Sequence, residues 1–330
     1  MIKYKHAARI KEPISAVGLG CWAFAGENFW GERSRDDASI GVIRTALDNG
    51  INLLDVAPAY GQGHSETVVG KAIKGYDRGK FLIASKCGLL LNKMGYEFPN
   101  LRKETILREI DDSLRRLDTD YIDIYQLHWP DPATPVEETA EAIRTIMDAG
   151  KIRYFGVTNF GVDDAEKMEH IVPIASQQAL YNMLERNPRT YHSINLVYRT
   201  ERETLPYCER HGQAFFPYSP LMQGLLGGHW KADRSFADND VRRLNPKLND
   251  ARYQIYYEAM VRLREISERY GHPLNETAVN WLIQKPVVTS VIGSCLSPEQ
   301  VETNVAALEW EIGPEMMAEI DKVLEPFENM

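Results

Sequence analysis

Eight short apolar segments recur along the chain, and amphipathic segments lie between them. The apolar segments are ISAVGLGCW (14–22), INLLDVA (51–57), FLIASKC (81–87), YIDIYQLH (121–128), KIRYFGVTN (151–159), ASQQALY (175–181), QAFFPYS (213–219) and VTSVIGS (288–294). Strands that alternate with helices are expected to run parallel, because each helix carries the chain back to the edge where the preceding strand began. Eight such units in 330 residues predict an α/β fold, a closed (β/α)8 barrel.

The segments between the strands have the periodicity of amphipathic helices. In residues 34–50, the side chains of Ile40, Ile43 and Leu47 fall on one helical face, and Gly50 suits the left-handed position that ends a helix. Residues 104–117 and 137–150 repeat this pattern.

An open, doubly wound sheet is the alternative arrangement of parallel strands. Such a sheet normally carries the dinucleotide-binding pattern GxGxxG directly after its first strand. Here VGLGCW offers only Gly18 and Gly20, without the third glycine. The sequence therefore favours the barrel.

Three stretches exceed the minimum for a barrel. The residues before the first strand predict an N-terminal capping segment, and residues 313–325 predict an extra helix packed outside the barrel. Residues 221–250, which follow the seventh strand, are rich in Gly, Asn, Asp and Arg and predict a long loop of the kind that covers binding sites. No linker interrupts the chain, so residues 1–330 are expected to form one domain.

Composition limits the partners and the compartment. A net charge of −9 argues against a nucleic-acid footprint and against anionic membranes. No apolar run approaches the ~18 residues needed to span a bilayer, and the first ten residues lack the apolar core of a signal peptide. The four cysteines form no CxxC pair, which favours reduced thiols and a cytoplasmic location. Monomer and homo-oligomer both stay open.

Polar side chains follow the apolar runs, at the strand ends where barrel enzymes place their active sites. These residues are Cys21, Trp22, Asp55, Lys86, His128, Trp129, Thr158, Asn159, Gln178, Tyr218, Ser219 and Ser294. Lys86 follows a strongly apolar strand, and a buried ammonium needs a carboxylate, which Asp55 on the adjacent strand can supply.

The same strand ends suggest a proton-transfer group. Tyr60 follows Asp55 by five residues, in a turn with Gly61 and Gly63. An ammonium beside a phenol is expected to lower its pKa from ~10, so Lys86 would make Tyr60 a usable proton donor. His128 would orient a carbonyl oxygen. This set contains no strong nucleophile, so it suits carbonyl reduction with a hydride brought by a cofactor.

The chain resembles the aldo-keto reductases over residues 14 to about 306. The matching motifs are Asp55 with Tyr60-Gly61 and Ser65-Glu66, Gly70-Lys71-Ala72, Lys86 in IASKCG, His128 in YIDIYQLHWPD, GKIRYFGVTNF with Thr158 and Asn159, Gln178 in QQALYN, and Tyr218 in PYSPL. The pattern PLMQGLLGG and the long loop are similar to the bacterial branch of the family, which is related to the potassium-channel β subunits.

The resemblance implies an NAD(P)-dependent oxidoreductase in which Asp55, Tyr60, Lys86 and His128 are catalytic and no metal is used. Gln178 would bind the nicotinamide amide, and Tyr218 would stack on the nicotinamide ring. The full set implied for cofactor binding is Trp22, Asp55, Thr158, Asn159, Gln178, Tyr218, Ser219, Pro220, Leu221, Gln223, Gly224, Ile292, Gly293, Ser294, Leu296, Gln300 and Asn304. Substrate contacts are expected from Trp22, Phe24, Trp30, Tyr60, His128 and Trp129.

The segment after the eighth strand departs from the family pattern. Leu296 stands where a cation would meet the 2′-phosphate of NADPH, Thr303 replaces an acid, and no Lys or Arg occurs from Pro286 to Asn304. The sequence therefore favours NAD over NADP. The alternative is that an arginine of the long loop supplies the charge, and the candidates are Arg234, Arg242 and Arg243.

The same strand ends argue against two other kinds of barrel enzyme. A metal-dependent hydrolase would need HxH in the first strand, and VGLGCW has no histidine. A glycoside hydrolase would need paired carboxylates after the fourth and seventh strands, which QLHWPD and PYSPL do not offer. A regulatory subunit that binds the cofactor and turns over slowly stays open as an alternative, because it would keep the same residues.

Overall fold

The computed structural model describes residues 2–26, 35–92 and 96–329. Eight parallel strands close a barrel in the order β10-β13-β14-β3-β4-β5-β8-β9. The strands are β3 (Val17–Gly20), β4 (Leu53–Asp55), β5 (Leu82–Cys87), β8 (Ile122–Leu127), β9 (Ile152–Thr158), β10 (Ser176–Leu180), β13 (Ala214–Tyr218) and β14 (Val291–Gly293). Each lies inside one of the eight predicted segments, so the (β/α)8 barrel is confirmed.

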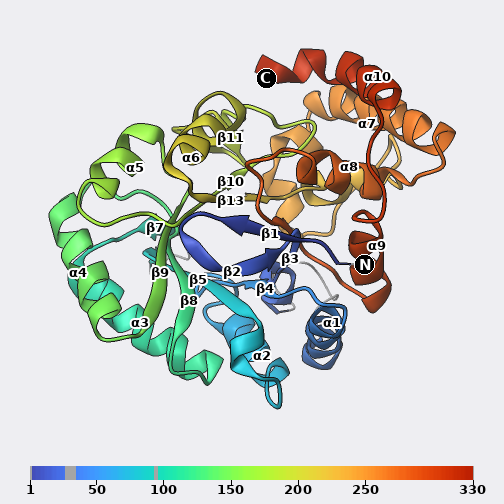
Figure 1. Cartoon of the computed structure of the whole chain (residues 1–330). Coiled ribbons are helices and arrows are strands. Elements are labelled where there is room, and N and C mark those ends of the chain that lie inside the picture. The colour runs from blue at the N-terminus through green and yellow to red at the C-terminus, as the bar shows by residue number, and fades with distance from the viewer. Residues whose placement is uncertain (1, 27–34, 93–95, 330) are drawn as a thin grey trace.

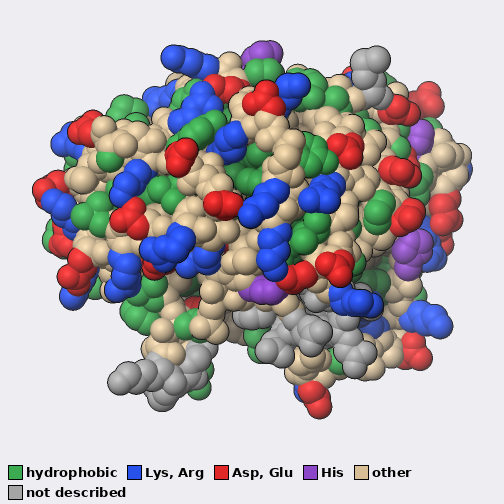
Figure 2. Space-filling model, turned by 90° about the horizontal axis from the view of Figure 1, so that it is seen from below, with side chains coloured by type: hydrophobic (Ala, Val, Ile, Leu, Met, Phe, Trp, Pro, Cys, Tyr) green, Lys and Arg blue, Asp and Glu red, His purple; other side chains and the backbone are tan. Residues whose placement is uncertain are grey.

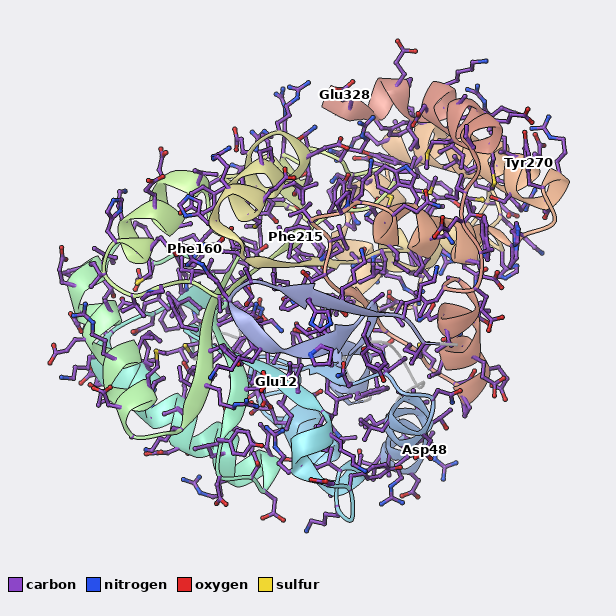
Figure 3. The ribbon with its side chains drawn as sticks, in the orientation of Figure 1. Glu12, Asp48, Phe160, Phe215, Tyr270 and Glu328 are labelled. Carbon is purple, nitrogen blue, oxygen red and sulfur yellow. The ribbon has the colours of Figure 1, made fainter. Side chains whose placement is uncertain are left out.

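Helices surround the barrel (Figure 1). They are α1 (Asp36–Asp48), α2 (His64–Ala72), α3 (Lys103–Leu117), α4 (Val136–Asp148), α5 (Val162–Glu169), α6 (Leu205–His211), α7 (Arg252–Arg269), α8 (Leu274–Ile283), α9 (Pro298–Ala306) and α10 (Pro314–Leu324). Their apolar faces form one continuous core with the outward side chains of the strands. Phe215 of β13 is fully buried in this core, whereas Tyr270 and Asp48 lie at the edge of the molecule (Figure 3).

A two-stranded hairpin, β1 (Tyr4–Ala7) and β2 (Ile10–Ser15), lies across one end of the barrel in Figure 1. Its Ile10 and Ile14 join a second apolar cluster with inward side chains of the strands, among them Leu53 and Phe216. The predicted N-terminal capping segment is therefore confirmed, and it closes the barrel at the end where the strands begin.

The extensions follow the sequence prediction, with additions. Residues 221–250 form a long loop with three short helical turns, η4 (Met222–Gly227), η5 (Val241–Leu244) and η6 (Pro246–Leu248). The predicted C-terminal helix is α10, which packs on α7 outside the barrel (Figure 1). Two further hairpins, β6 (Leu89–Leu91) with β7 (Glu97–Pro99) and β11 (Thr190–Tyr191) with β12 (Ile194–Asn195), were not predicted.

The surface carries charges of both signs. On the face shown in Figure 2, Lys and Arg side chains are interspersed with Asp and Glu rather than gathered into a basic patch. No helix in the described part of the chain has the length and apolar character needed to cross a membrane.

Candidate active site

A buried ion pair lies at the centre of the predicted site. Asp55 ends β4 and Lys86 lies near the end of the neighbouring strand β5. The Lys86 Nζ is 2.7 Å from Asp55 Oδ1 and 3.1 Å from the carbonyl oxygen of Val56, and the two residues are 0% and 3% exposed. Because a charge in the protein interior is tolerated only when it is paired, each residue requires the other.

The turn after β4 brings Tyr60 back to this pair. The Tyr60 hydroxyl is 3.2 Å from Lys86 Nζ. Gly61 follows with a φ of +64°, and a Cβ at this position would lie 2.0 Å from the carbonyl oxygen of Ala25. Only glycine fits such a close approach, so the Tyr60-Gly61 pair sets the direction of the phenol.

The protonation state of Tyr60 differs from the prediction. Burial raises its pKa well above the ordinary value, and the nearby Asp55 carboxylate raises it further. The prediction of a Tyr60 pKa below the ordinary value is therefore wrong, because the phenol is removed from water beside a carboxylate. The phenol stays protonated, which is the form that donates a proton.

His128 faces Tyr60 from the end of β8. The two rings make an edge contact with centroids 5.9 Å apart. Burial, assisted by the Lys86 ammonium, lowers the pKa of His128 well below its usual value. The imidazole is therefore neutral near pH 7 and offers one N–H donor and one acceptor.

An amide cluster occupies the ends of β9 and β10. Gln178 Nε2 donates to Asp55 Oδ1 at 2.8 Å, and Asn159 Nδ2 donates to the carbonyl oxygen of His128 at 3.2 Å. The Thr158 hydroxyl is buried and has no hydrogen-bond partner within the described residues. A buried polar atom left in this state is suited to a ligand group.

Two tyrosines fix the orientation of Asn159. Its Oδ1 accepts from the hydroxyl of Tyr198 at 3.0 Å and from the hydroxyl of Tyr218 at 2.9 Å. Tyr198 was missed by the sequence analysis, because it lies outside every predicted strand end and 39 residues from its partner. The sequence shows Tyr198 as an aromatic residue in the connection after β10, which does not by itself indicate a contact with Asn159.

The loop after β13 has an unusual backbone. Met222, Gln223 and Gly224 have φ values of +46°, +56° and +102°, and Ser219 has a φ of +59°. Within this turn the backbone N–H groups of Met222 and Gly224 donate to the carbonyl oxygens of Ser219 and Leu221, both at 2.9 Å. The predicted residues Pro220 and Leu221 lie within the same turn.

The remaining predicted cofactor residues lie in and around the turn between β14 and α9: Ile292 and Gly293 end β14, Ser294 and Leu296 lie in the turn, and Gln300 and Asn304 lie on α9. The Ser294 hydroxyl donates to the carbonyl oxygen of Gly20 at 2.8 Å, which joins this turn to β3. The Gln300 side chain accepts from the backbone N–H of Leu296 at 2.7 Å, and the Leu296 side chain is 38% exposed. The turn presents no cation here.

The predicted substrate residues divide into three groups. The Trp22 ring lies 6.1 Å from the Tyr60 ring, and Trp129 is half-buried beside His128 in the chain. Phe24 is only 1% exposed and packs in the main core, which argues against its predicted contact with substrate. Trp30 lies outside the described residues.

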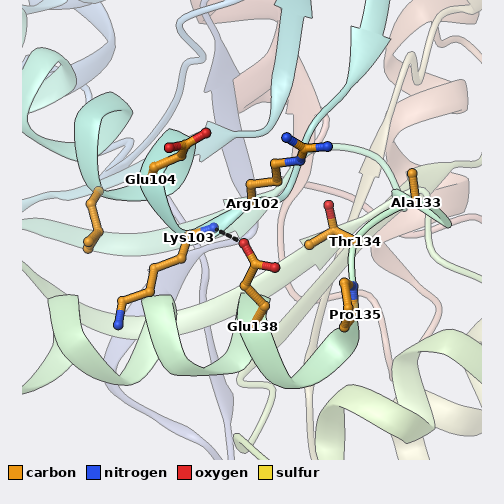
Figure 4. Close-up of a pocket in the computed structure, with 8 residues that line it drawn as sticks. Arg102, Lys103, Glu104, Ala133, Thr134, Pro135 and Glu138 are labelled. Atoms are coloured by element: carbon orange, nitrogen blue, oxygen red, sulfur yellow. Dashed lines mark hydrogen bonds between the residues drawn. The ribbon is translucent and has the colours of Figure 1, made fainter.

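A surface depression of about 640 Å³ lies elsewhere, between the N-terminal ends of α3 and α4 (Figure 4). The backbone N–H of Lys103 donates to Glu138 at 3.0 Å within it. Its lining residues include none of the predicted site residues. Carboxylates of the protein itself already accept hydrogen bonds from Lys103 here, so this depression is not the candidate active site.

A closed barrel with a Tyr-Lys-Asp set and a neutral histidine at its strand ends defines an oxidoreductase that acts on carbonyl and alcohol groups. Comparison with known families agrees with this class. The model of the family described as "Aldo/keto reductase family" matches residues 16–325. The chain belongs to this family, whose members are NAD(P)-dependent oxidoreductases.

Relatives and solved structures cover nearly the whole chain. The aldo-keto reductase YhdN of Bacillus subtilis is 37% identical over 98% of this chain and 94% of its own. An NADH-specific methylglyoxal reductase of Escherichia coli is 32% identical over 89% and 90%. A putative voltage-gated potassium channel subunit beta of Schizosaccharomyces pombe is 28% identical over 98% and 93%, which confirms the predicted branch. The structure of a glycerol dehydrogenase from Gluconobacter oxydans matches with a TM-score of 0.85 and 33% identity, over 98% and 95%.

Proposed function

We propose that this enzyme interconverts small aldehydes or ketones and their alcohols, with Tyr60 as the proton donor and acceptor. The observation that carries the proposal is the 3.2 Å contact between the Tyr60 hydroxyl and Lys86 Nζ, with Asp55 behind the lysine. The nicotinamide cofactor supplies or accepts the hydride when bound.

Each residue has a separate task in the proposed reaction. Tyr60 donates its phenolic proton to the carbonyl oxygen, and the Lys86 ammonium stabilises the phenolate that is left. Asp55 holds Lys86 in place. Neutral His128 donates a hydrogen bond that orients the carbonyl oxygen.

The described residues fit a nicotinamide cofactor. The unpaired Thr158 hydroxyl, with Asn159 and Gln178, offers polar groups for the carboxamide. Tyr218 is half-buried at the edge of this region and would cover the nicotinamide ring.

Several features support NAD in preference to NADP. Leu296 offers no charge to a 2′-phosphate. The loop arginines already have other contacts: Arg242 Nε is 2.8 Å from Asp240, Arg243 pairs with Asp238, and Arg234 lies 3.4 Å above the Trp230 ring. The relative named as NADH-specific agrees with this reading.

Leu296→Arg is expected to shift the cofactor preference toward NADPH by about tenfold, because it adds one charge-assisted hydrogen bond at a half-exposed turn. Fluorescence titration with NADH and NADPH in parallel measures both dissociation constants. Leu296→Gln adds polarity without charge and serves as the matched control. If the ratio of the two dissociation constants did not change in the arginine variant, other residues would have to bind the 2′-phosphate.

A regulatory subunit with slow turnover is the second candidate, and the relative named as a channel β subunit favours it. We expect steady-state oxidation of NADH by small carbonyl compounds, at turnover numbers in the usual range of about 1–10³ per second. One bound equivalent oxidised in a burst, followed by release over minutes, would favour the regulatory role instead.

The proposal also includes one catalytic domain, a cytoplasmic location and small oxygenated substrates. We treat residues 1–330 as one catalytic domain, which the family match over 16–325 supports. A cytoplasmic location is supported by the four cysteines, all of them free. The names of the relatives, which mention methylglyoxal and glycerol, support small oxygenated substrates.

A further inference from the structure

The β11–β12 hairpin reaches the edge of the site. The Tyr191 ring lies 5.4 Å from Tyr218, and the His192 ring lies 6.3 Å from Trp22, whose ring is 6.1 Å from Tyr60. Trp22 follows β3 and Tyr218 ends β13, and these strands flank β14 in the barrel. The hairpin tip therefore lies over the part of the barrel mouth next to Tyr60.

A chain of hydrogen bonds fixes which nitrogen of His192 carries its proton. The backbone N–H of Lys247 donates to Asn245 Oδ1 at 3.1 Å, and Asn245 Nδ2 donates to Gln223 Oε1 at 2.9 Å. Gln223 Nε2 is then 2.9 Å from His192 Nε2. Because a backbone N–H can only donate, it sets the direction of every bond in the chain, and Nε2 must accept. The proton lies on Nδ1.

His192 is held neutral and in place. Burial lowers its pKa to about 4, so the imidazole stays uncharged near pH 7. Lys247 Nζ binds Glu185 at 2.5 Å and the carbonyl oxygen of Thr190 at 2.9 Å, which ties the hairpin to the long loop. The ring is half-buried, and no described residue accepts a hydrogen bond from Nδ1.

We propose that His192 is a substrate-binding residue whose Nδ1–H donates to an oxygen on the carbon next to the reacting carbonyl. A donor fixed beside Trp22, near Tyr60, selects small α-oxygenated carbonyl compounds, such as hydroxyaldehydes and hydroxyketones, over their plain alkyl analogues. This inference rests on the proposed function and names its substrate class. It also assigns the Gln223 side chain to holding His192, which leaves the Gln223 backbone for the cofactor.

Matched substrates and three variants test the inference. Glyceraldehyde and propanal differ in hydroxyl groups but share the aldehyde. His192→Phe, which keeps a ring but has no donor, is expected to lower kcat/KM for glyceraldehyde about tenfold and to leave propanal within about twofold. His192→Asn should retain the preference, because its Nδ2 occupies the place of the imidazole Nδ1. His170→Phe is the matched control, because His170 is exposed and follows the C-terminal end of α5.

The outcomes separate this inference from the proposed function. A wild-type protein that reduces neither aldehyde with NADH or NADPH would overturn the function itself. If the wild type is active but His192→Phe lowers kcat/KM equally for glyceraldehyde and propanal, only the role of His192 would be overturned. The role of His192 in substrate binding would also be overturned if His192→Phe weakened NADH binding in a fluorescence titration, because the residue would then act on the cofactor.

Discussion

Tyr60→Phe is expected to lower the rate of carbonyl reduction by about 10²–10⁴-fold, the usual contribution of a positioned proton donor. The substitution removes one hydroxyl and keeps the ring, so the contacts with Trp22 and His128 persist. Cofactor affinity should stay near the wild-type value, because the hydroxyl contacts Lys86 rather than the predicted cofactor residues. Single-turnover oxidation of bound NADH measures the chemical step, and fluorescence titration measures binding.

Tyr76→Phe is the control for the loss of a phenol. Its hydroxyl donates to Asp48 at 2.9 Å at an exposed position outside the barrel. This variant should reduce carbonyls at the wild-type rate. If Tyr60→Phe did the same, the proton would have to come from another group, and His128 would become the first candidate.

The sequence was sufficient for the barrel and for the groups at its strand ends. Each strand is a short apolar run, and a parallel barrel places the carboxyl ends of all its strands at one rim. Asp55, Lys86 and Gln178 come from segments far apart in sequence, yet they meet within hydrogen-bond distance. The regular fold determines these contacts, so the pattern of strands predicts them.

Contacts made by the connecting segments could not be predicted in this way. Tyr198 and His192 belong to the connection between β10 and α6, whose course depends on packing rather than on a repeating pattern. His192 reaches Gln223 across 31 residues, and Gln223 in turn depends on Asn245. The burial of Phe24 has a similar cause, because sequence alone does not say whether an aromatic after a strand faces the core or the mouth of the barrel.

The pKa of Tyr60 was predicted in the wrong direction for a different reason. The sequence shows which charges are near the phenol but not how much water surrounds it. Burial, and after it the Asp55 carboxylate, raises this pKa. The ammonium then matters after the proton has left, when it lies 3.2 Å from the phenolate oxygen.

Lys86→Met is expected to abolish reduction and to lower the free energy of unfolding by about 3–5 kcal/mol. Methionine has a similar length but no charge, so among the described residues the buried carboxylate of Asp55 would keep only the Gln178 amide as a partner. The rate should fall about as far as in Tyr60→Phe, because the phenolate loses the charge that stabilises it. Chemical denaturation gives the stability, and single-turnover kinetics give the rate.

The double variant Asp55→Asn/Lys86→Met separates the two losses. Asparagine is neutral, and its Oδ1 can still accept from Gln178, so no unpaired charge remains in the interior. Most of the lost stability should return, since removing both charges of a buried pair costs far less than removing one. Reduction should stay as slow as in Lys86→Met, because no ammonium faces Tyr60. A double variant that regained reduction together with stability would mean that Lys86 acts only on the fold, and that the proton transfer at Tyr60 needs no neighbouring charge.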